Sequence, residues 1–271
     1  MRTLKMNSLA LIVIIGLMIS GCAQVAITGA ADVDKNSFGA KKKFAVVSIA
    51  SLKTFQGEQG LGQMFTKNDD IPGMNTQPLI NKLRPKIIGA MGKSKYFTLL
   101  PEDSVLASKA YRNLAEDEKI MKILFMNETM NVANNYKYVS DEQKYAKLAS
   151  DLGVDGVIGI TVNFLISSGK GTLSVMGLSL GKKSYSATAS ISAIAYNKKG
   201  EVIWKDSTMK EADPDDTKAI ILIDTSSISD TNFEKFHPSA IEIGGKAVDT
   251  LLARLDDTMS GKEVSRIQSV K

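Results

Sequence analysis

Two stretches of the sequence decide the fold: residues 154–166 (VDGVIGITVNFLI) and residues 185–196 (YSATASISAIAY). The first is a long run of apolar, mostly β-branched side chains, which predicts a strand, and Gly156 and Gly159 within it permit a close approach or a bulge. In the second, apolar residues alternate with serine and threonine, which indicates an antiparallel strand with one buried face. The turn and apolar return in residues 197–205 (NKKGEVIWK) predict a hairpin with the second strand.

Further elements are expected around these strands. Residues 44–50 (FAVVSIA) predict a central strand because they are apolar on both faces. Apolar positions recur at helical spacing through residues 77–93 and 240–255, which predicts two amphipathic helices. The remaining expectations are a long loop at 52–75, a strand at 96–100, a short helix from Glu102, a helix at 114–133, and a helix that begins at a Ser140–Gln143 capping box and ends at Gly153.

These elements predict one α/β domain with a mixed, largely antiparallel sheet flanked by helices. We expect this domain to occupy residues 41–258. Residues 1–21 are predicted to be a lipoprotein signal peptide, and residues 22–40 a lipidated cysteine followed by a flexible tether of small and polar residues. Residues 259–271 are expected to form a polar tail.

The amino terminus has the pattern of a secretory signal. The basic residues Arg2 and Lys5 precede an apolar run at residues 9–19, which is too short for a membrane-spanning helix of about 20 residues. The tetrad at 19–22 (ISGC) resembles the bacterial lipobox, which implies lipid modification of Cys22 and cleavage just before it. The alternative is an unmodified cysteine that ends an apolar stretch.

The residue after the cysteine indicates which of the two bacterial membranes holds the lipoprotein. Lipoproteins kept in the inner membrane usually carry Asp at that position, whereas this chain carries Ala23. The resemblance therefore implies an outer-membrane lipoprotein that faces the periplasm, anchored by the lipid at Cys22. Several acyl chains on one cysteine suffice for stable anchoring, since each buried methylene contributes about 0.8 kcal/mol.

Composition and charge exclude several classes of protein. A single Cys and a single His cannot form a disulfide framework, a thiolate zinc site or a multi-histidine metal centre. Removal of Arg2 and Lys5 with the signal leaves 32 basic and 29 acidic side chains, and the basic residues come in short groups rather than along one helix. We therefore expect no nucleic-acid partner.

The sequence offers little for catalysis. His237, the only imidazole, lies between Phe236 and Pro238, where it is expected to pack or cap a helix rather than abstract a proton. None of the acidic pairs fits a calcium loop, and solvated carboxylates are their more common role. We expect no catalytic residue, no metal, no cofactor and no enzymatic activity, with a hydrolase centred on His237 as the least favoured alternative.

The order of elements over residues 43–256 resembles the superfamily that includes the TolB amino-terminal domain, the curli-secretion (CsgG-like) lipoprotein and the peptidoglycan-synthase activator lipoproteins. The most specific pieces are residues 153–156 (GVDG), which enter the long strand, and residues 197–204 (NKKGEVIW) in the hairpin. The resemblance implies a mixed α/β domain used for protein–protein contacts in the cell envelope. It brings no catalytic residues.

Residues 167–183 are the most unusual segment, rich in Gly and Ser with scattered apolar residues. One interpretation is a membrane-inserted hairpin of an oligomeric secretion or export pore, as the resemblance to the curli-secretion lipoprotein implies. The other, which we favour because the alternation fails at residues 176–178, is a surface loop that docks on a partner. The candidate contact residues under either interpretation are Leu173, Val175, Met176, Leu178 and Leu180.

The sequence therefore predicts a lipid-anchored, non-enzymatic binding or adaptor module for cell-envelope proteins. The alternative is a homo-oligomeric outer-membrane pore subunit.

Overall fold

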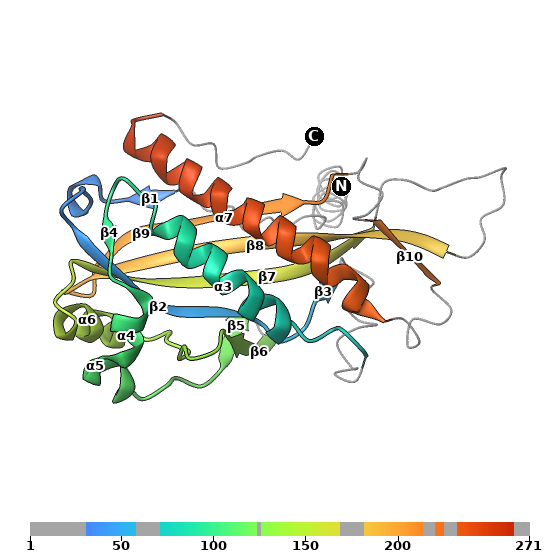
Figure 1. Ribbon diagram of the computed structural model, residues 1–271, viewed down its shortest axis with the longest axis horizontal. Helices are drawn as coiled ribbons and strands as arrows, with labels where there is room; N and C mark the ends of the chain where they lie inside the picture. Colours follow the sequence, from blue (N-terminus) through green and yellow to red (C-terminus); the bar gives the residue numbers. More distant parts are fainter. Residues whose placement is uncertain are drawn as a thin grey trace, which may run out of the picture.

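The computed structural model describes residues 31–57, 71–123, 126–168, 182–213, 220–224 and 232–262 (Figure 1). Its strands are β1 (Asp32–Val33), β2 (Lys43–Leu52), β3 (Gln56–Gly57), β4 (Thr98–Leu99), β5 (Ile120–Ile123), β6 (Met126–Val132), β7 (Gly156–Ser168), β8 (Lys182–Asn197), β9 (Val202–Glu211) and β10 (Ile220–Asp224). Its helices are η1 (Lys35–Ser37), α3 (Gln77–Met91), α4 (Glu102–Ala107), α5 (Lys109–Arg112), α6 (Glu142–Asp151), η3 (Phe233–Phe236) and α7 (His237–Met259).

All of these strands belong to one mixed sheet, whose main path has the order β1-β9-β8-β7-β2-β6-β5. The long hairpin of β7 and β8 is its centre, with β9 antiparallel to β8 on one side and β2 parallel to β7 on the other. The parallel pairings join β2 to β4, β2 to β7, and β3 to β7. All the other pairings of described strands are antiparallel, so antiparallel pairings are the majority. The predicted single α/β domain with a mixed, largely antiparallel sheet is confirmed.

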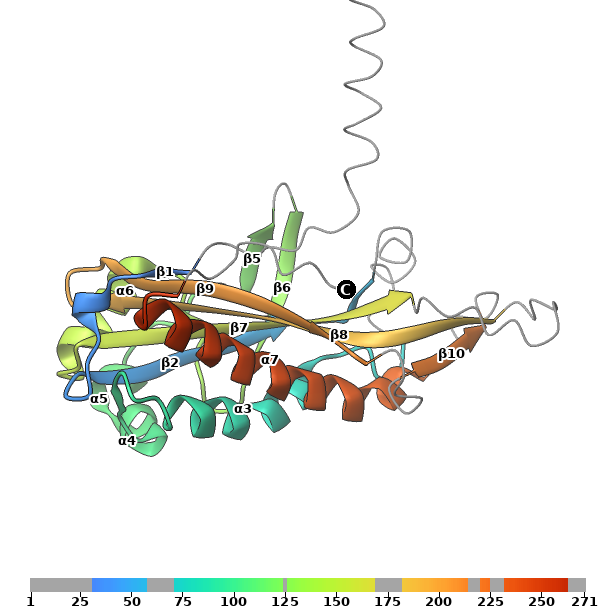
Figure 2. The ribbon, with the colours of Figure 1, turned by 90° about the horizontal axis from the view of Figure 1, so that it is seen from above.

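The helices cover the two faces of the sheet unequally. Figure 2 shows α3 and α7 side by side along one face. A Cβ at Gly244 of α7 would lie 3.6 Å from the ring of Phe164 in β7, whereas a Cβ at Gly159 of β7 would clash with the hydroxyl of Tyr145 in α6. Residues 159 and 164 point to opposite faces of a strand, so α6 lies on the face opposite α3 and α7.

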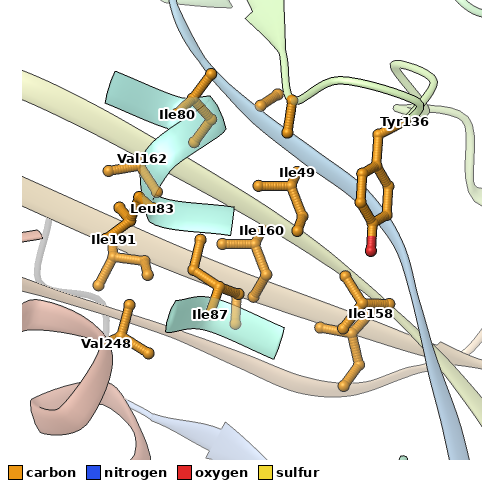
Figure 3. Close-up of a cluster of buried hydrophobic side chains, with 14 of the residues drawn as sticks. Ile49, Ile80, Leu83, Ile87, Tyr136, Ile158, Ile160, Val162, Ile191 and Val248 are labelled. Atoms are coloured by element: carbon orange, nitrogen blue, oxygen red, sulfur yellow. The ribbon is translucent and has the colours of Figure 1, made fainter. Parts of the chain in front are cut away.

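The main core lies between the sheet and the two long helices (Figure 3). Fully burying each of these aliphatic side chains contributes about 1.5–3 kcal/mol, so this layer is the principal source of stability. Its labelled members include Ile80, Leu83 and Ile87 from α3, Val248 from α7, and Ile49, Ile158, Ile160, Val162 and Ile191 from the strands.

The glycines of β7 sit under aromatic rings. A Cβ at Gly159 would clash with Tyr145, and a Cβ at Gly156 would lie 2.5 Å from the ring of Phe44. The prediction that these two positions permit a close approach is confirmed, and aromatic side chains are what approach them.

The predicted helix at 114–133 is wrong. Part of this segment forms the hairpin of β5 and β6, in which Ile120 pairs with Thr129, and β6 then pairs with the end of β2 through Val132 opposite Ala50. Its Met, Leu, Lys and Glu residues favour helices intrinsically, but such a preference is weak and is overridden by a pairing with a strand far away in the sequence.

The cap of α6 also differs from the prediction. Asp141, not Ser140, is the N-cap, and its Oδ1 accepts a hydrogen bond from Gln143 N at 2.7 Å. The backbone N–H of Ser140 instead donates to Asp117 Oδ2. Gly153 follows the helix with a φ of +66°, so its predicted role at the carboxyl end is confirmed.

The folded domain begins earlier than the expected boundary at residue 41. Asp32 and Val33 pair with Lys205 and Trp204 of β9, and Phe38 is buried and stacks on Phe44 with ring centroids 5.1 Å apart. The described part of the predicted tether is therefore part of the domain. Composition missed this because one aromatic residue in a polar run carries no periodicity.

Other expected elements occur with shifted bounds. The strand expected at 96–100 is reduced to β4, and β9 extends well beyond residue 205, to Glu211. The helix expected from 240 begins at His237. The loop expected at 52–75 contains β3, and its residues 58–70 lie outside the described residues, as do residues 263–271 of the expected tail.

Candidate binding face between α3 and α7

Two long helices lie next to each other on one face of the sheet and run in the same direction. Helix α3 carries Pro78 in its first turn, and its buried residues recur at helical spacing. Three contacts fix its register against α7: Leu83 packs at Gly244, the side chain of Lys86 lies over Gly245, and the Tyr96 hydroxyl just after α3 donates to Asp256. Because the residue numbers increase together, the two helices are parallel.

The inner side of α7 is fixed to the sheet by a buried ion pair. Arg254 donates three hydrogen bonds to Asp206 of β9, from Nε at 3.1 and 3.0 Å and from Nη2 at 2.7 Å. The two side chains are 6% and 0% exposed, respectively. Planar, charge-assisted contacts of this kind fix geometry strongly, so the outer side of α7 has a defined orientation.

An open groove of about 790 Å³ runs between the outer sides of the two helices and is hereafter called the α3–α7 groove. Small residues open it. A Cβ at Gly89 would meet no atom within 4 Å, and a Cβ at Gly245 would meet only the flexible side chain of Lys86, at 3.4 Å. Its other small or apolar lining residues are Pro85, Ala90, Ser94, Leu252, Ala253 and Leu255.

Charged side chains of both signs border the groove. Lys86 lies on α3, Lys93 and Lys95 follow this helix, and Glu242, Lys246, Asp249 and Asp256 lie on α7. The three carboxylates of α7 are seven residues apart, which is two helical turns or about 10.5 Å, so they follow a line along that helix.

Some of these charges are paired within the chain. Lys246 Nζ lies 2.8 Å from Glu242 Oε1, and Lys95 Nζ lies 2.6 Å from Asp256 Oδ1. The hydrogen bond from Lys246 holds the pKa of Glu242 below its usual value. The hydrogen bonds from Lys95 and then Tyr96 do the same for the pKa of Asp256.

Three charges of the groove have no ion pair or hydrogen bond within the described residues. No hydrogen bond or ion pair joins the side chains of Lys86, Lys93 or Asp249 to any residue in the described part of the chain. All three residues are exposed. The groove thus combines exposed glycine backbone at residue 89 with charges that the described residues leave without an ion pair.

The candidates drawn from the sequence lie elsewhere. Cys22 lies outside the described residues, as do Leu173, Val175, Met176, Leu178 and Leu180 in the connection between β7 and β8. Strands β7 and β8 pair as far as Ser168 and Tyr185. The described residues therefore give no support to the pore, and the anchor and the docking loop stay predictions.

His237 serves packing. Its Nε2 lies 2.8 Å from the carbonyl oxygen of Gly73, and its ring stacks on Phe55 with centroids 6.1 Å apart. Gly73 has a φ of +80°, and a Cβ there would clash with the backbone nitrogen of Glu234, so this junction requires glycine. The histidine joins the segment before α3 to the start of α7.

Neither a metal cluster nor a membrane span is found in the described ranges. Among these residues, no group of three or more His, Cys, Asp or Glu side chains is arranged to hold a metal ion. No described helix combines the length and apolar content that a membrane span requires.

Sequence reasoning missed the groove residues. A signal was present, because the seven-residue spacing of Lys86 and Lys93, and of Glu242, Asp249 and Asp256, can be read directly from the sequence. Nothing in the sequence shows that the two sets face the same groove.

No protein-family model and no curated protein matches this chain. Among solved structures, it is similar to the LpoB C-terminal domain from Salmonella enterica, with 12% sequence identity over 64% of this chain and 85% of that domain. The TM-score is 0.32. A score of this size carries no argument about the family, partner or activity of this chain.

Proposed function

We propose that this chain is a lipid-anchored, non-enzymatic protein-binding module of the bacterial cell envelope, and that its contact surface is the α3–α7 groove. The observation that carries the proposal is the combination, on one outward face, of two open glycines with three exposed charges that the described residues leave unpaired. The lipid anchor at Cys22 and the position at the periplasmic face of the outer membrane rest on the lipobox resemblance.

The glycines support a protein partner. Gly within a helix is less favourable than Ala by about 1 kcal/mol, and both Gly89 and Gly245 have room for a methyl group. Their presence on adjacent outer faces is explained if another backbone must come close, because only Gly leaves that space free.

The charges support the same function. Exposed ion pairs contribute about 0–1 kcal/mol to stability, so Lys86, Lys93 and Asp249 contribute little to the fold where they stand. Charges that border an apolar strip are common at the polar rim of a protein interface, where they select the partner and its orientation.

The anchor is tested by replacing the modified residue. We expect Cys22→Ala to remove lipid labelling of the protein and to release it from membranes into the soluble envelope fraction. A Cys22→Ala protein that still fractionates with membranes would contradict the proposed anchor while leaving the binding face untouched.

The binding face is tested by site-specific photocrosslinking in cells. A photoreactive amino acid at position 89, where an added Cβ has no described atom within 4 Å, is expected to give a protein adduct of defined mass. The matched control is the same amino acid at Lys147, an exposed ion-paired position of α6 on the other face of the sheet. Equal crosslinking at the two positions, or none at position 89, would overturn the proposal.

A further inference from the structure

We infer that the occupant of the α3–α7 groove is an amphipathic helix of another protein, with acidic residues along the edge that meets α3. The inference rests on the proposed function in one respect, namely that this face binds protein. It adds the secondary structure of the partner segment and the sign of its charge. The walls of the groove argue for the first, and its rim argues for the second.

The walls of the groove favour a helix over an extended segment. Both walls belong to long helices, whose backbone N–H and C=O groups are largely bonded within each helix. An extended segment would find no strand edge to pair with here, and its buried backbone would lose hydrogen bonds to water. A helix satisfies its own backbone and needs only side-chain contacts, which is the basis of helix-in-groove recognition.

The floor of the groove suits the apolar face of such a helix. Gly89 and Ala253 leave room for a close approach, and Leu252 supplies apolar contact. The lining residues of α7 extend from Glu242 to Asp256, which corresponds to about 21 Å or nearly four helical turns. A partner helix of about four turns therefore lies along the whole groove.

The α3 side of the groove carries cations that the fold leaves without ion pairs. Lys86 and Lys93 line the groove, and Lys82 lies one turn before Lys86 on the same side of α3. All three side chains are exposed, and no ion pair joins any of them to a residue in the described part of the chain. A row of like charges on this side favours a partner with carboxylates on the facing edge.

The α7 side differs, because most of its carboxylates are already neutralised within the chain. Glu242 is paired with Lys246, and Asp256 is paired with Lys95. Asp249 is exposed and has no ion pair with a described residue. A matching helix therefore carries a cation on its second edge, near Asp249, and a larger number of carboxylates on its first edge.

An anionic membrane surface matches this groove less well than an acidic helix does. Its headgroups would meet the cations of α3, but they would also meet the line of carboxylates Glu242, Asp249 and Asp256 on α7. A flat bilayer surface also cannot reach the floor between two helices. A helix that carries both signs of charge on separate edges satisfies both sides of the groove.

The test is photocrosslinking in intact cells from position 89 of the full lipidated chain. The charge variant carries Lys86→Glu and Lys93→Glu. The matched control carries Lys198→Glu and Lys199→Glu, in the exposed turn between β8 and β9. We expect the adduct yield to fall roughly tenfold in the charge variant and to stay at the level of the parent in the control.

The crosslinked partner segment is then identified by mass spectrometry, synthesised as a peptide and titrated against the purified chain. We expect a helix-forming segment with carboxylates along one edge, whose dissociation constant rises roughly tenfold for the charge variant. Replacement of these carboxylates by lysine is expected to weaken binding to the parent and to restore binding to the charge variant. This exchange separates a direct charge contact from an indirect effect on the fold.

Each outcome decides the inference. It is overturned if the charge variant crosslinks like the parent, if the crosslinked segment is neutral, basic or extended, or if the adduct is a lipid. An unfolding midpoint close to that of the parent confirms that the charge variant is folded. A protein adduct that does not respond to the charge variant contradicts this inference and leaves the proposed function standing, whereas the absence of any protein adduct at position 89 contradicts both.

Discussion

The inner and outer sides of α7 differ in how tightly they pack against the rest of the molecule. On the inner side, a methyl group added at Gly244 would lie 3.0 Å from Leu83, and Arg254 is held by Asp206. On the outer side, the adjacent Gly245 faces an open groove, and Asp249 has no partner in the described residues. The inner side of the helix serves stability, and the outer side is available for binding.

The largest effect on stability is expected from a substitution that removes the buried ion pair on the inner side of α7. Asp206→Ala removes the acceptor of three hydrogen bonds from Arg254 and leaves the charge of that arginine buried, so we expect the free energy of unfolding to fall by about 3–5 kcal/mol. Urea denaturation measures it. The matched control on the outer side is Glu242→Ala, which removes an exposed, solvent-screened ion pair and is expected to change stability far less. Equal losses of unfolding free energy in the two variants would contradict the different roles assigned to the inner and outer sides of α7.

The neighbouring glycines provide a smaller and sharper comparison. Gly245→Ala and Gly89→Ala add a methyl group where there is room and gain helix propensity, so each is expected to raise stability by up to about 1 kcal/mol. Gly244→Ala gains the same propensity but presses on Leu83, and overpacking typically costs about 1–3 kcal/mol. We therefore expect Gly244→Ala to be the least stable of the three in thermal unfolding. If Gly244→Ala were as stable as Gly245→Ala, the inner side would be less tightly packed than described.

The smallest expected effect concerns pH. Burial disfavours the charge of Asp117, but hydrogen bonds from Lys144 and from the backbone of Ser140 and Asp141 outweigh it and lower the pKa of Asp117. A carboxyl group with a lowered folded-state pKa stabilises the fold above its unfolded value near about 3.9, and this contribution is lost as pH falls through the folded value. We expect the thermal unfolding midpoint to fall less steeply with pH below about pH 4 in Lys144→Met than in the parent chain.

The matched control for the pH experiment is Lys246→Met in the groove. Its partner Glu242 also has a lowered pKa, but both side chains are largely exposed and solvent screens the pair. The acid limb of the parent is therefore expected to change little in this variant. A larger change for Lys246→Met than for Lys144→Met would contradict the weaker role assigned to the outer side.

Local patterns predicted most of the central sheet and both long helices. Each of these patterns is local: the apolar run predicts β7, the alternation predicts β8, and the helical spacing predicts α3 and α7. They can therefore be recognised without knowledge of the tertiary structure. Residues 114–133 could not be predicted in this way, because their strand is made by pairing with β2, which is distant in the sequence. Phe38 is buried for the same reason.

The candidate site was less accessible to sequence reasoning than the fold. Lys86 and Asp249 belong to helices that are far apart in the sequence, and only the tertiary packing of α3 on α7 places them beside one groove. A seven-residue spacing of charges is common on exposed helices and does not by itself indicate a binding face. Of the Gly- and Ser-rich segment 167–183, the ends belong to β7 and β8, and residues 169–181 lie outside the described residues.

The most direct test of the account is the reactivity of individual lysines in the native envelope. Amine-modifying reagents are applied to intact envelopes and to the purified, unanchored chain at low concentration, and the modified sites are quantified by mass spectrometry. We predict that Lys86 and Lys93 are protected in the envelope relative to the purified chain, while the exposed controls Lys147 and Lys199 are modified equally in both. Equal reactivity of all four lysines in the two preparations would contradict the claim that the α3–α7 groove is the binding face.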